Sequence, residues 1–213
     1  SILWSNQLLL NVAIYDTWVS DYQALTYDES PTLIGNSRLN NLLNVGKVRL
    51  TGADVDFQAA LPWQISLRGG VSYNRAITED FTNAPDEDTQ QNTRDLSGQP
   101  LANAPTWSGN LGVVKECSLP DGLRAYASLD YNYRSTYNAT LERSRNSVIE
   151  GYGLLGARLG LAGSSGWDAS VWARNLLDTD YVSSIQALYG VGSYGAFAGG
   201  PGISVGSVRL LWR

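Results

Sequence analysis

The side chains that most often perform catalysis or bind metals are scarce in this chain. It has no histidine and a single cysteine, Cys117, among its 213 residues. A Ser-His-Asp triad therefore cannot form within the chain, and zinc sites of the His/Cys type are excluded in the same way. An enzymatic activity has to be argued from a site, so we predict that the chain is not an enzyme and has neither a metal site nor a cofactor.

Arginine offers recognition chemistry instead. A guanidinium group presents a planar fork of donors that can bind a chelated, anionic or planar ligand through two hydrogen bonds at once. The alternative is that such charges are ordinary features of a wall that faces water. The substrate-binding candidates among the arginines are Arg124, Arg134, Arg158 and Arg174.

A glycine-rich and aromatic segment, 182–202, supplies a second group of candidates. Its aromatic side chains Tyr189, Tyr194 and Phe197 could stack on a planar ligand at a substrate mouth. The same composition also suits a mobile surface loop, and both interpretations stay open.

Carboxylates gather in one other segment, 79–95. Hard cations such as calcium bind carboxylate oxygens, but the spacing here fits no EF-hand pattern, and a solvated loop is the favoured interpretation. The formal net charge of the chain is -5, which argues against a nucleic-acid partner because phosphate binding needs clustered Lys and Arg. The acidic residues of the segment are Glu79, Asp80, Asp86, Glu87, Asp88 and Asp95.

The elements that carry these residues show a period of two. In 123–134, apolar residues such as Leu123, Ala127 and Leu129 alternate with polar residues such as Arg124 and Asp130. Successive side chains of a strand point to opposite faces, so one face is apolar and the other is polar. We therefore predict an all-β, antiparallel fold with about eight strands near 7–27, 42–60, 63–79, 106–118, 123–137, 149–162, 167–181 and 203–213.

The strand predicted over 42–60 is less regular than the others. Val48 and Leu50 share one parity, whereas Val55, Phe57 and Ala59 share the other. A β-bulge at Gly52, between the two sets, would restore the register.

The connections between the predicted strands alternate in length. Short ones at 61–62, 119–122 and 163–166 alternate with long ones near 28–41, 80–105, 138–148 and 182–202. A bacterial outer-membrane β-barrel has this layout, with tight turns on the periplasmic side and long loops outside. Trp63 and Trp167 each open a strand after a short turn, as expected of an aromatic girdle at a membrane interface. The sequence therefore predicts a transmembrane barrel segment in contact with outer-membrane lipid.

Three segments resemble the C-terminal barrel of TonB-dependent outer-membrane receptors. They are Asn44–Phe57, with Asn44-Val45-Gly46-Lys47 at its start, Leu96–Trp107, with Asn103-Ala104-Pro105, and Ala173–Tyr181, with Asn175-Leu176-Leu177-Asp178. Their order and spacing match the family over nearly the whole chain. A departure lies at the end, where Arg213 follows Trp212 although the family usually ends in an aromatic residue.

The resemblance implies a plugged barrel of about 22 strands that imports scarce nutrients such as ferric siderophores. We expect residues 1–213 to be the C-terminal part of such a barrel, with the plug domain and the first strands upstream of Ser1. The TonB energy-transducing system would act through that absent plug. Cut out alone, the chain should then be neither a closed barrel nor a competent transporter.

Three other architectures or functions compete with this one. A complete barrel of about eight strands with a structural or adhesive role would also fit the alternation. An outer-membrane enzyme is disfavoured by the missing histidine, and a soluble β-sandwich is disfavoured because all long connections fall at one end.

Overall fold

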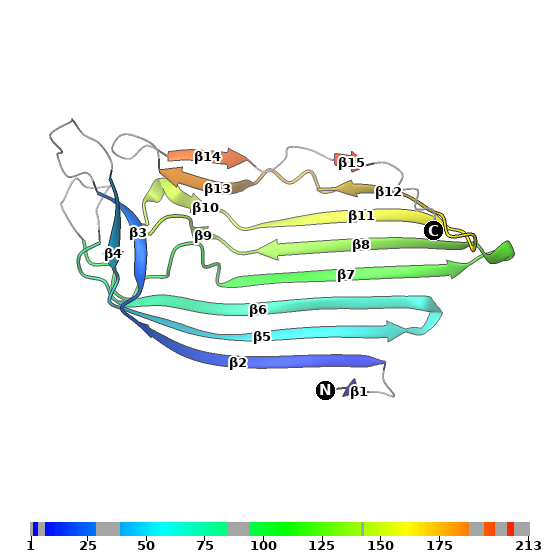
Figure 1. Cartoon of the computed structure of the whole chain (residues 1–213), viewed down its shortest axis with the longest axis horizontal. Coiled ribbons are helices and arrows are strands. Elements are labelled where there is room, and N and C mark those ends of the chain that lie inside the picture. The colour runs from blue at the N-terminus through cyan, green and yellow to red at the C-terminus, as the bar shows by residue number, and fades with distance from the viewer. Residues whose placement is uncertain are drawn as a thin grey trace.

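A single antiparallel sheet of nine strands dominates the protein (Figure 1). The structure, a computed structural model, describes residues 2–3, 7–28, 39–84, 94–141, 143–187, 194–198 and 204–206. Every neighbouring pair in the main sheet is antiparallel, in the order β1-β2-β5-β6-β7-β8-β11-β12-β15. The strands are β1 (Ile2–Leu3), β2 (Leu8–Ser20), β5 (Lys47–Leu61), β6 (Ile65–Asp80), β7 (Trp107–Ser118), β8 (Arg124–Arg134), β11 (Tyr152–Ala162), β12 (Asp168–Arg174) and β15 (Ser204–Gly206).

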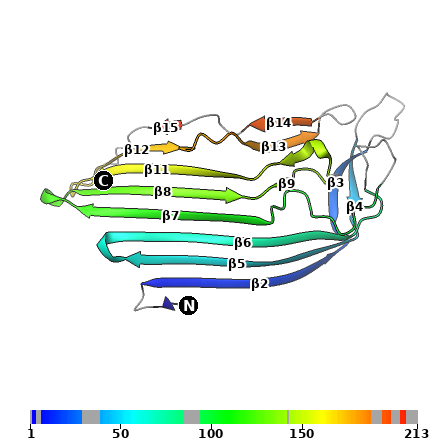
Figure 2. The same ribbon diagram turned by 180° about the vertical axis from the view of Figure 1, so that it is seen from behind.

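Three two-stranded sheets lie together at one end of the main sheet, which we call the loop end (Figures 1 and 2). The opposite end, the turn end, carries the short 3-10 turns Pro62–Gln64 and Pro120–Gly122. The predicted separation of long and short connections is therefore confirmed. The small sheets pair β3 (Gln23–Asp28) with β4 (Leu39–Asn44), β9 (Tyr137–Asn138) with β10 (Val148–Ile149), and β13 (Val182–Ala187) with β14 (Tyr194–Ala198).

The two faces of the main sheet differ as the alternation predicts. Between β8 and β11, Ala127 lies opposite Leu159 and Ser128 lies opposite Arg158, so the two parities occupy separate faces. Large side chains on the apolar face are exposed, and a contiguous exposed apolar surface of this kind marks contact with a membrane or a partner. They include Val12, Ile14, Val71, Leu111, Leu129, Leu159 and Val171. None of the described helical segments is long and apolar enough to cross a membrane.

Several predicted strands are shorter than their sequence pattern suggests. The first breaks at Asp21 and the second at Gly46, because both residues have left-handed backbones, with φ of 54° and 64°. Beyond these positions β3 and β4 bend away from β2 and β5 (Figure 1). The strand predicted over 167–181 ends at Arg174, and the predicted loop 182–202 contains the β13–β14 hairpin. Of the strand predicted over 203–213, residues 207–213 lie outside the described residues.

The predicted bulge at Gly52 is wrong. The pairing runs without a shift through Gly52 on both sides, opposite Tyr15 and Asn74, and the irregularity in β5 falls between Lys47 and Val48. Val48 and Leu50 therefore point to the polar face. Apolar residues can lie there because they are covered by protein rather than by water.

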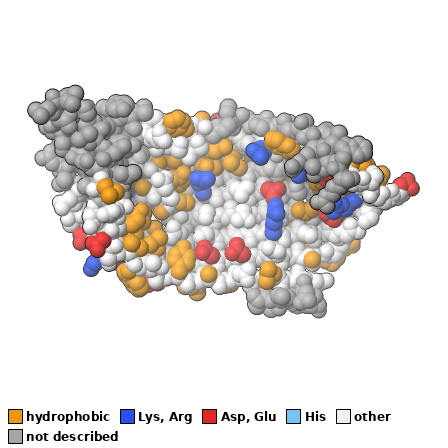
Figure 3. All heavy atoms as spheres, in the orientation of Figure 1, with side chains coloured by type: hydrophobic (Ala, Val, Ile, Leu, Met, Phe, Trp, Pro, Cys, Tyr) orange, Lys and Arg blue, Asp and Glu red, His pale blue; other side chains and the backbone are white. Residues whose placement is uncertain are grey.

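That cover is a small core at the loop end. Val45, Val48, Phe81, Ala84 and Leu96 are all buried and pack together. Figure 3 shows hydrophobic side chains gathered at this end of the polar face, while charged groups are scattered over its middle. The segment after β6 thus folds back over the polar face near the loop end.

Candidate functional site

A polar groove crosses the middle of the polar face toward the loop end. Its volume is about 460 Å³, and all its lining residues except Pro105 come from five adjacent strands, β5 to β8 and β11. One row of aligned residues runs Ser72, Ser108, Arg134 and Tyr152 across β6, β7, β8 and β11. The strand register therefore holds these side chains in one line.

The β5 side of the groove is acidic. The Ser72 hydroxyl donates to Asp54 Oδ1 at 2.5 Å, and both Asp54 and Asp56 line the groove. Asp56 needs the glycine opposite it, because a Cβ atom at Gly70 would lie 2.5 Å from Asp56 Oδ1. Small residues on β6 thus leave room for two carboxylates to face the groove.

The β8 side is basic and aromatic. The Arg134 guanidinium carbon lies 5.0 Å from the centre of the Tyr152 ring and 6.0 Å from that of Tyr137. Arg134 Nη1 also donates to the Tyr137 hydroxyl at 3.2 Å. Stacking on two rings restrains a side chain that otherwise has many rotamers, so the fork is held in place.

A tight turn after β12 completes the aromatic side. Asn175 Nδ2 donates to the carbonyl of Thr179, and the Thr179 backbone amide donates back to Asn175 Oδ1, both at 3.0 Å. The Thr179 hydroxyl donates to the carbonyl of Gly153 at 3.1 Å and fixes the turn to β11. The ring of Tyr181 then lies 4.5 Å from that of Tyr152, centre to centre.

Comparison with known proteins now decides the family. The family model described as TonB dependent receptor-like, beta-barrel, matches residues 2–176. The chain belongs to this family. The resemblance noted from the sequence is confirmed, and the polar face is the wall that faces the lumen of the receptor barrel.

Solved structures of receptors share the fold of this chain. The ferric yersiniabactin uptake receptor FyuA from Yersinia pestis has 18% sequence identity and a TM-score of 0.67, with 91% of this chain and 26% of that chain covered. The siderophore receptor PiuA from Acinetobacter baumannii has 14% identity and a TM-score of 0.64, with 96% and 26% covered. The chain thus spans about a quarter of the length of these receptors. No curated protein sequence matches it.

The predicted arginines of this receptor barrel all lie on the lumenal face but are not brought together. Arg134 lines the groove, whereas Arg124 lies at the turn end and pairs with Glu116 at 3.0 Å. Arg158 lies opposite Ser128 and Trp172. The guanidinium carbon of Arg174 lies 4.8 Å from the Trp172 ring centre. Their proposed contact with substrate stays a prediction.

The three predicted aromatic candidates fall in or near the β13–β14 hairpin of the receptor. Phe197, in β14, is exposed with 51% of its surface accessible. Tyr194 begins β14, but its side chain is not among the described ones, and Tyr189 lies outside the described residues.

Sequence reasoning missed the tyrosines that surround Arg134. Tyr152 has the parity of Arg158 and lies within the strand predicted over 149–162, so the alternation already placed it on the polar face. Tyr181 ends the segment that carried the family resemblance, which is a second signal that was present in the sequence. Asp54 and Asp56 alternate with Val55 and Phe57, so their parity already placed both carboxylates on the polar face, and the incorrect bulge reversed only the residues before Gly52.

Hydrogen bonds join separate segments of the chain at the loop end of the receptor barrel. The buried Thr78 hydroxyl donates to the carbonyl of Leu96 at 2.5 Å, and the Leu101 amide donates to the carbonyl of Ala76 at 3.0 Å. The Arg143 guanidinium donates to the carbonyl of Pro100 at 2.9 Å. Burial, and secondly the nearby charge of Arg94, lowers the pKa of Arg143.

The acidic segment 79–95 gives no sign of a metal site in its described part. Asp95 Oδ1 accepts a hydrogen bond from the Ser97 amide at 2.8 Å, and hydrogen bonds from Ser97 lower the pKa of this carboxyl. Within the described ranges no group of three His, Cys, Asp or Glu residues could hold a metal ion. Asp86, Glu87 and Asp88 lie outside those ranges.

Proposed function

We propose that this chain is the C-terminal part of an outer-membrane receptor that imports a ferric siderophore or a similar chelate. In this proposal residues 1–213 supply part of the barrel wall, and a plug domain elsewhere in the receptor contacts TonB. The substrate class is supported by the structural neighbours, which include the ferric yersiniabactin uptake receptor FyuA, the ferric-catecholate import receptor Fiu and the siderophore receptor PiuA.

The arrangement around Arg134 carries the proposal. Ferric chelates are often anionic and contain planar donor groups, which suit a guanidinium fork backed by aromatic rings. Arg134, Tyr152 and Tyr137 offer both features on the lumenal wall, on the side of the long loops. An incoming chelate would reach this wall before it reached the turn end.

The alternative of a complete small barrel has less support. Among the described strands, β1 and β15 form opposite ends of the nine-stranded sheet and pair only with β2 and β12. A closed barrel of about eight strands would pair its first and last strands.

Ligand binding to the full receptor that carries this sequence tests the proposal. Ferric hydroxamate, ferric catecholate and ferric citrate would be titrated while tryptophan fluorescence is followed. We expect at least one to bind, and Arg134→Gln to weaken that binding about tenfold, as for loss of a charge-assisted hydrogen bond to the chelate. Arg68→Gln is the control, since Arg68 lies on the same face and pairs with Asp130 outside the groove.

Two results would contradict the proposal. One is that none of the three chelate classes binds to a receptor whose barrel is folded, as judged by its heat-dependent shift on a gel. The other is that Arg134→Gln and Arg68→Gln reduce binding equally, which would remove the groove from substrate recognition.

A further inference from the structure

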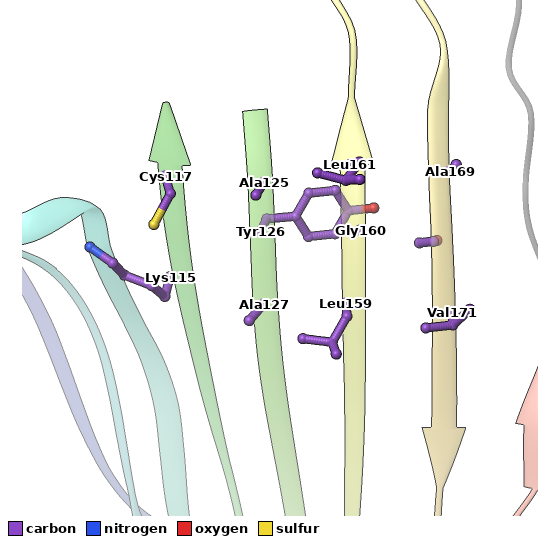
Figure 4. Close-up of a pocket in the computed structure, with 11 residues that line it drawn as sticks. Lys115, Cys117, Ala125, Tyr126, Ala127, Leu159, Gly160, Leu161, Ala169 and Val171 are labelled. Carbon is purple, nitrogen blue, oxygen red and sulfur yellow. The ribbon is translucent and has the colours of Figure 1, made fainter. Parts of the chain in front are cut away.

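Two grooves of similar size lie on opposite faces of the sheet. The one on the lipid-facing surface has a volume of about 470 Å³ and spans β7, β8, β11 and β12 (Figure 4). Its lining is largely apolar, with Ala125, Ala127 and Leu159 among its residues, and Figure 4 shows the Lys115 ammonium directed away from these side chains. Of the two, the lumenal groove around Arg134 is therefore the one that offers charged groups to a water-soluble ligand.

The lumenal groove carries opposite charges at its two ends. Asp54 and Asp56 stand on β5, whereas Arg134 stands on β8. Strands β6 and β7 lie between them, so the backbones at the two ends are about 14 Å apart, or three inter-strand spacings. Arg134 stacks on Tyr152 of β11, on the side away from β5. The positive and the negative groups are thereby held apart across the groove.

The floor between the two ends holds hydrogen-bonding groups without charge. Ser72 and Ser108 are aligned across β6 and β7, and in the next row Asn110 of β7 is aligned with Asn132 of β8. Figure 3 shows acidic and basic groups on this face separated by uncharged polar surface. A groove of this kind is complementary to a ligand that bears a negative and a positive group at its two ends, and we call such a ligand dipolar.

The acidic end suits a protonated amine. The two carboxylates lie two residues apart on one face of β5, about 7 Å along the strand. Asp54 Oδ1 accepts the Ser72 hydroxyl, and Asp56 is exposed. An ammonium group has three N–H donors, and its bonds to carboxylates are about twice as strong as those of neutral donors. A neutral hydroxyl would leave two neighbouring negative charges without compensation.

We propose that the chelate recognised by this receptor is dipolar and carries a protonated amine in addition to anionic metal-binding donors. The anionic donors accept hydrogen bonds from Arg134, and the amine, on an arm long enough to cross β6 and β7, donates to Asp54 and Asp56. This inference rests on the proposed function, because it names the class of ferric chelate that the same groove binds.

Matched pairs of ligands test the inference on the full receptor. A ferric hydroxamate and a ferric catecholate would each be prepared with one primary amine on a flexible arm and, separately, with that amine acetylated. The Kd of each is measured by tryptophan fluorescence, with ferric citrate as a chelate that has no amine. We expect the amine form to bind about tenfold more tightly than its acetylated partner, the gain from a charge-assisted hydrogen bond.

Variants at the two ends of the groove should respond differently. The double variant Asp54→Asn with Asp56→Asn should lose the preference for the amine and keep its affinity for the acetylated form. Arg134→Gln should weaken both forms alike and keep the preference. Asp130→Asn is the control for charge, since Asp130 lies on the same face outside the groove and pairs with Arg68.

The outcomes separate this inference from the proposed function. Equal binding of the amine and acetylated forms, binding of ferric citrate alone, or a preference that survives in the double variant would overturn the inference and leave the proposed function standing. If no chelate binds to the folded receptor, the proposed function fails and the inference fails with it.

Discussion

The phenol ring of Tyr15 lies across the backbone of Gly52 on the neighbouring strand. The two residues are paired in the register of β2 and β5, and the Tyr15 hydroxyl donates to Asn74 Oδ1 on β6 at 3.3 Å. A Cβ atom on Gly52 would meet this ring at a distance that no real contact shows. Because Gly52 has no side chain, the Tyr15 ring can pack over it. The Tyr15 side chain thereby links three strands, β2, β5 and β6.

Gly52→Ala should therefore destabilise the barrel by about 1–3 kcal/mol, the usual cost of overpacking a filled site. Gly156→Ala is the matched control, because the nearest atom to its added Cβ would be the Ala173 carbonyl oxygen at an ordinary 3.4 Å. Urea titration of receptor folded in lipid vesicles measures both. Equal loss of stability in the two variants would show that Tyr15 does not pack as described.

The two faces of β8 predict opposite responses at adjacent positions. Ala127→Arg would place a charge on the lipid-facing surface, where the cost is about 2–4 kcal/mol at the membrane midplane and falls to about 0–1 kcal/mol at the interface, whereas Ser128→Arg would face the lumen and cost less. Spin labels attached at the two positions measure which of them is accessible from the lipid. A lipid-soluble quencher should act more strongly at position 127, and stronger quenching at 128 would reverse the assignment of faces.

Thr78 should hold the segment that follows β6 against the barrel. Its buried hydroxyl donates to the carbonyl of Leu96, which also accepts from the Gln99 amide. Thr78→Val removes the first of these bonds and should cost about 0.5–1.5 kcal/mol. We expect faster amide hydrogen exchange in 94–101 and unchanged exchange in β7 and β8. Thr17→Val, at an exposed position of β2, is the control and should leave the segment protected.

Asn138 should stabilise the connection between β8 and β11 through hydrogen bonds of its side chain. Its side chain donates to the carbonyl of Ser144 at 3.0 Å and accepts from the Ser147 hydroxyl at 2.6 Å and the Thr140 amide at 3.1 Å. Asn138→Ala removes all three bonds, and we expect a loss of about 1–3 kcal/mol in local stability. Limited proteolysis within 139–149 should then speed up, while the exposed Asn146→Ala in the same connection leaves the rate unchanged.

The sheet could be predicted from the sequence because apolar and polar residues alternate along each strand for a single physical reason. Wherever one face meets lipid and the other meets water, residue type alternates with the pleat, and 123–134 and 63–74 follow that rule with few exceptions. The strand predicted over 106–118 and the observed β7, Trp107–Ser118, differ by a single residue.

The alternation fails where one face of a strand is covered by protein instead of meeting water or lipid. Val48 and Leu50 lie on the polar face yet contact protein rather than water, so their parity suggested a bulge at Gly52 that does not exist. The surroundings of Arg134 were hidden for another reason. Tyr137, Tyr152 and Tyr181 come from three separate segments. Tyr152 reaches Arg134 through the register of β8 and β11, and Tyr181 reaches Tyr152 through the turn fixed by Asn175, and no local period encodes either contact.

The short turns have a consequence for how this sheet assembles. The 3-10 turns Pro62–Gln64 and Pro120–Gly122 each begin at the proline of a Leu-Pro pair and reverse the chain within a few residues, with left-handed backbones at Trp63 and Asp121, φ of 62° and 61°. Because β5 pairs with β6 and β7 with β8 directly across these turns, their first contacts close very small loops, which form fast. Such hairpins can form early as local units and then join side by side, so the slow steps of folding are the pairings across the long connections, such as β6 with β7.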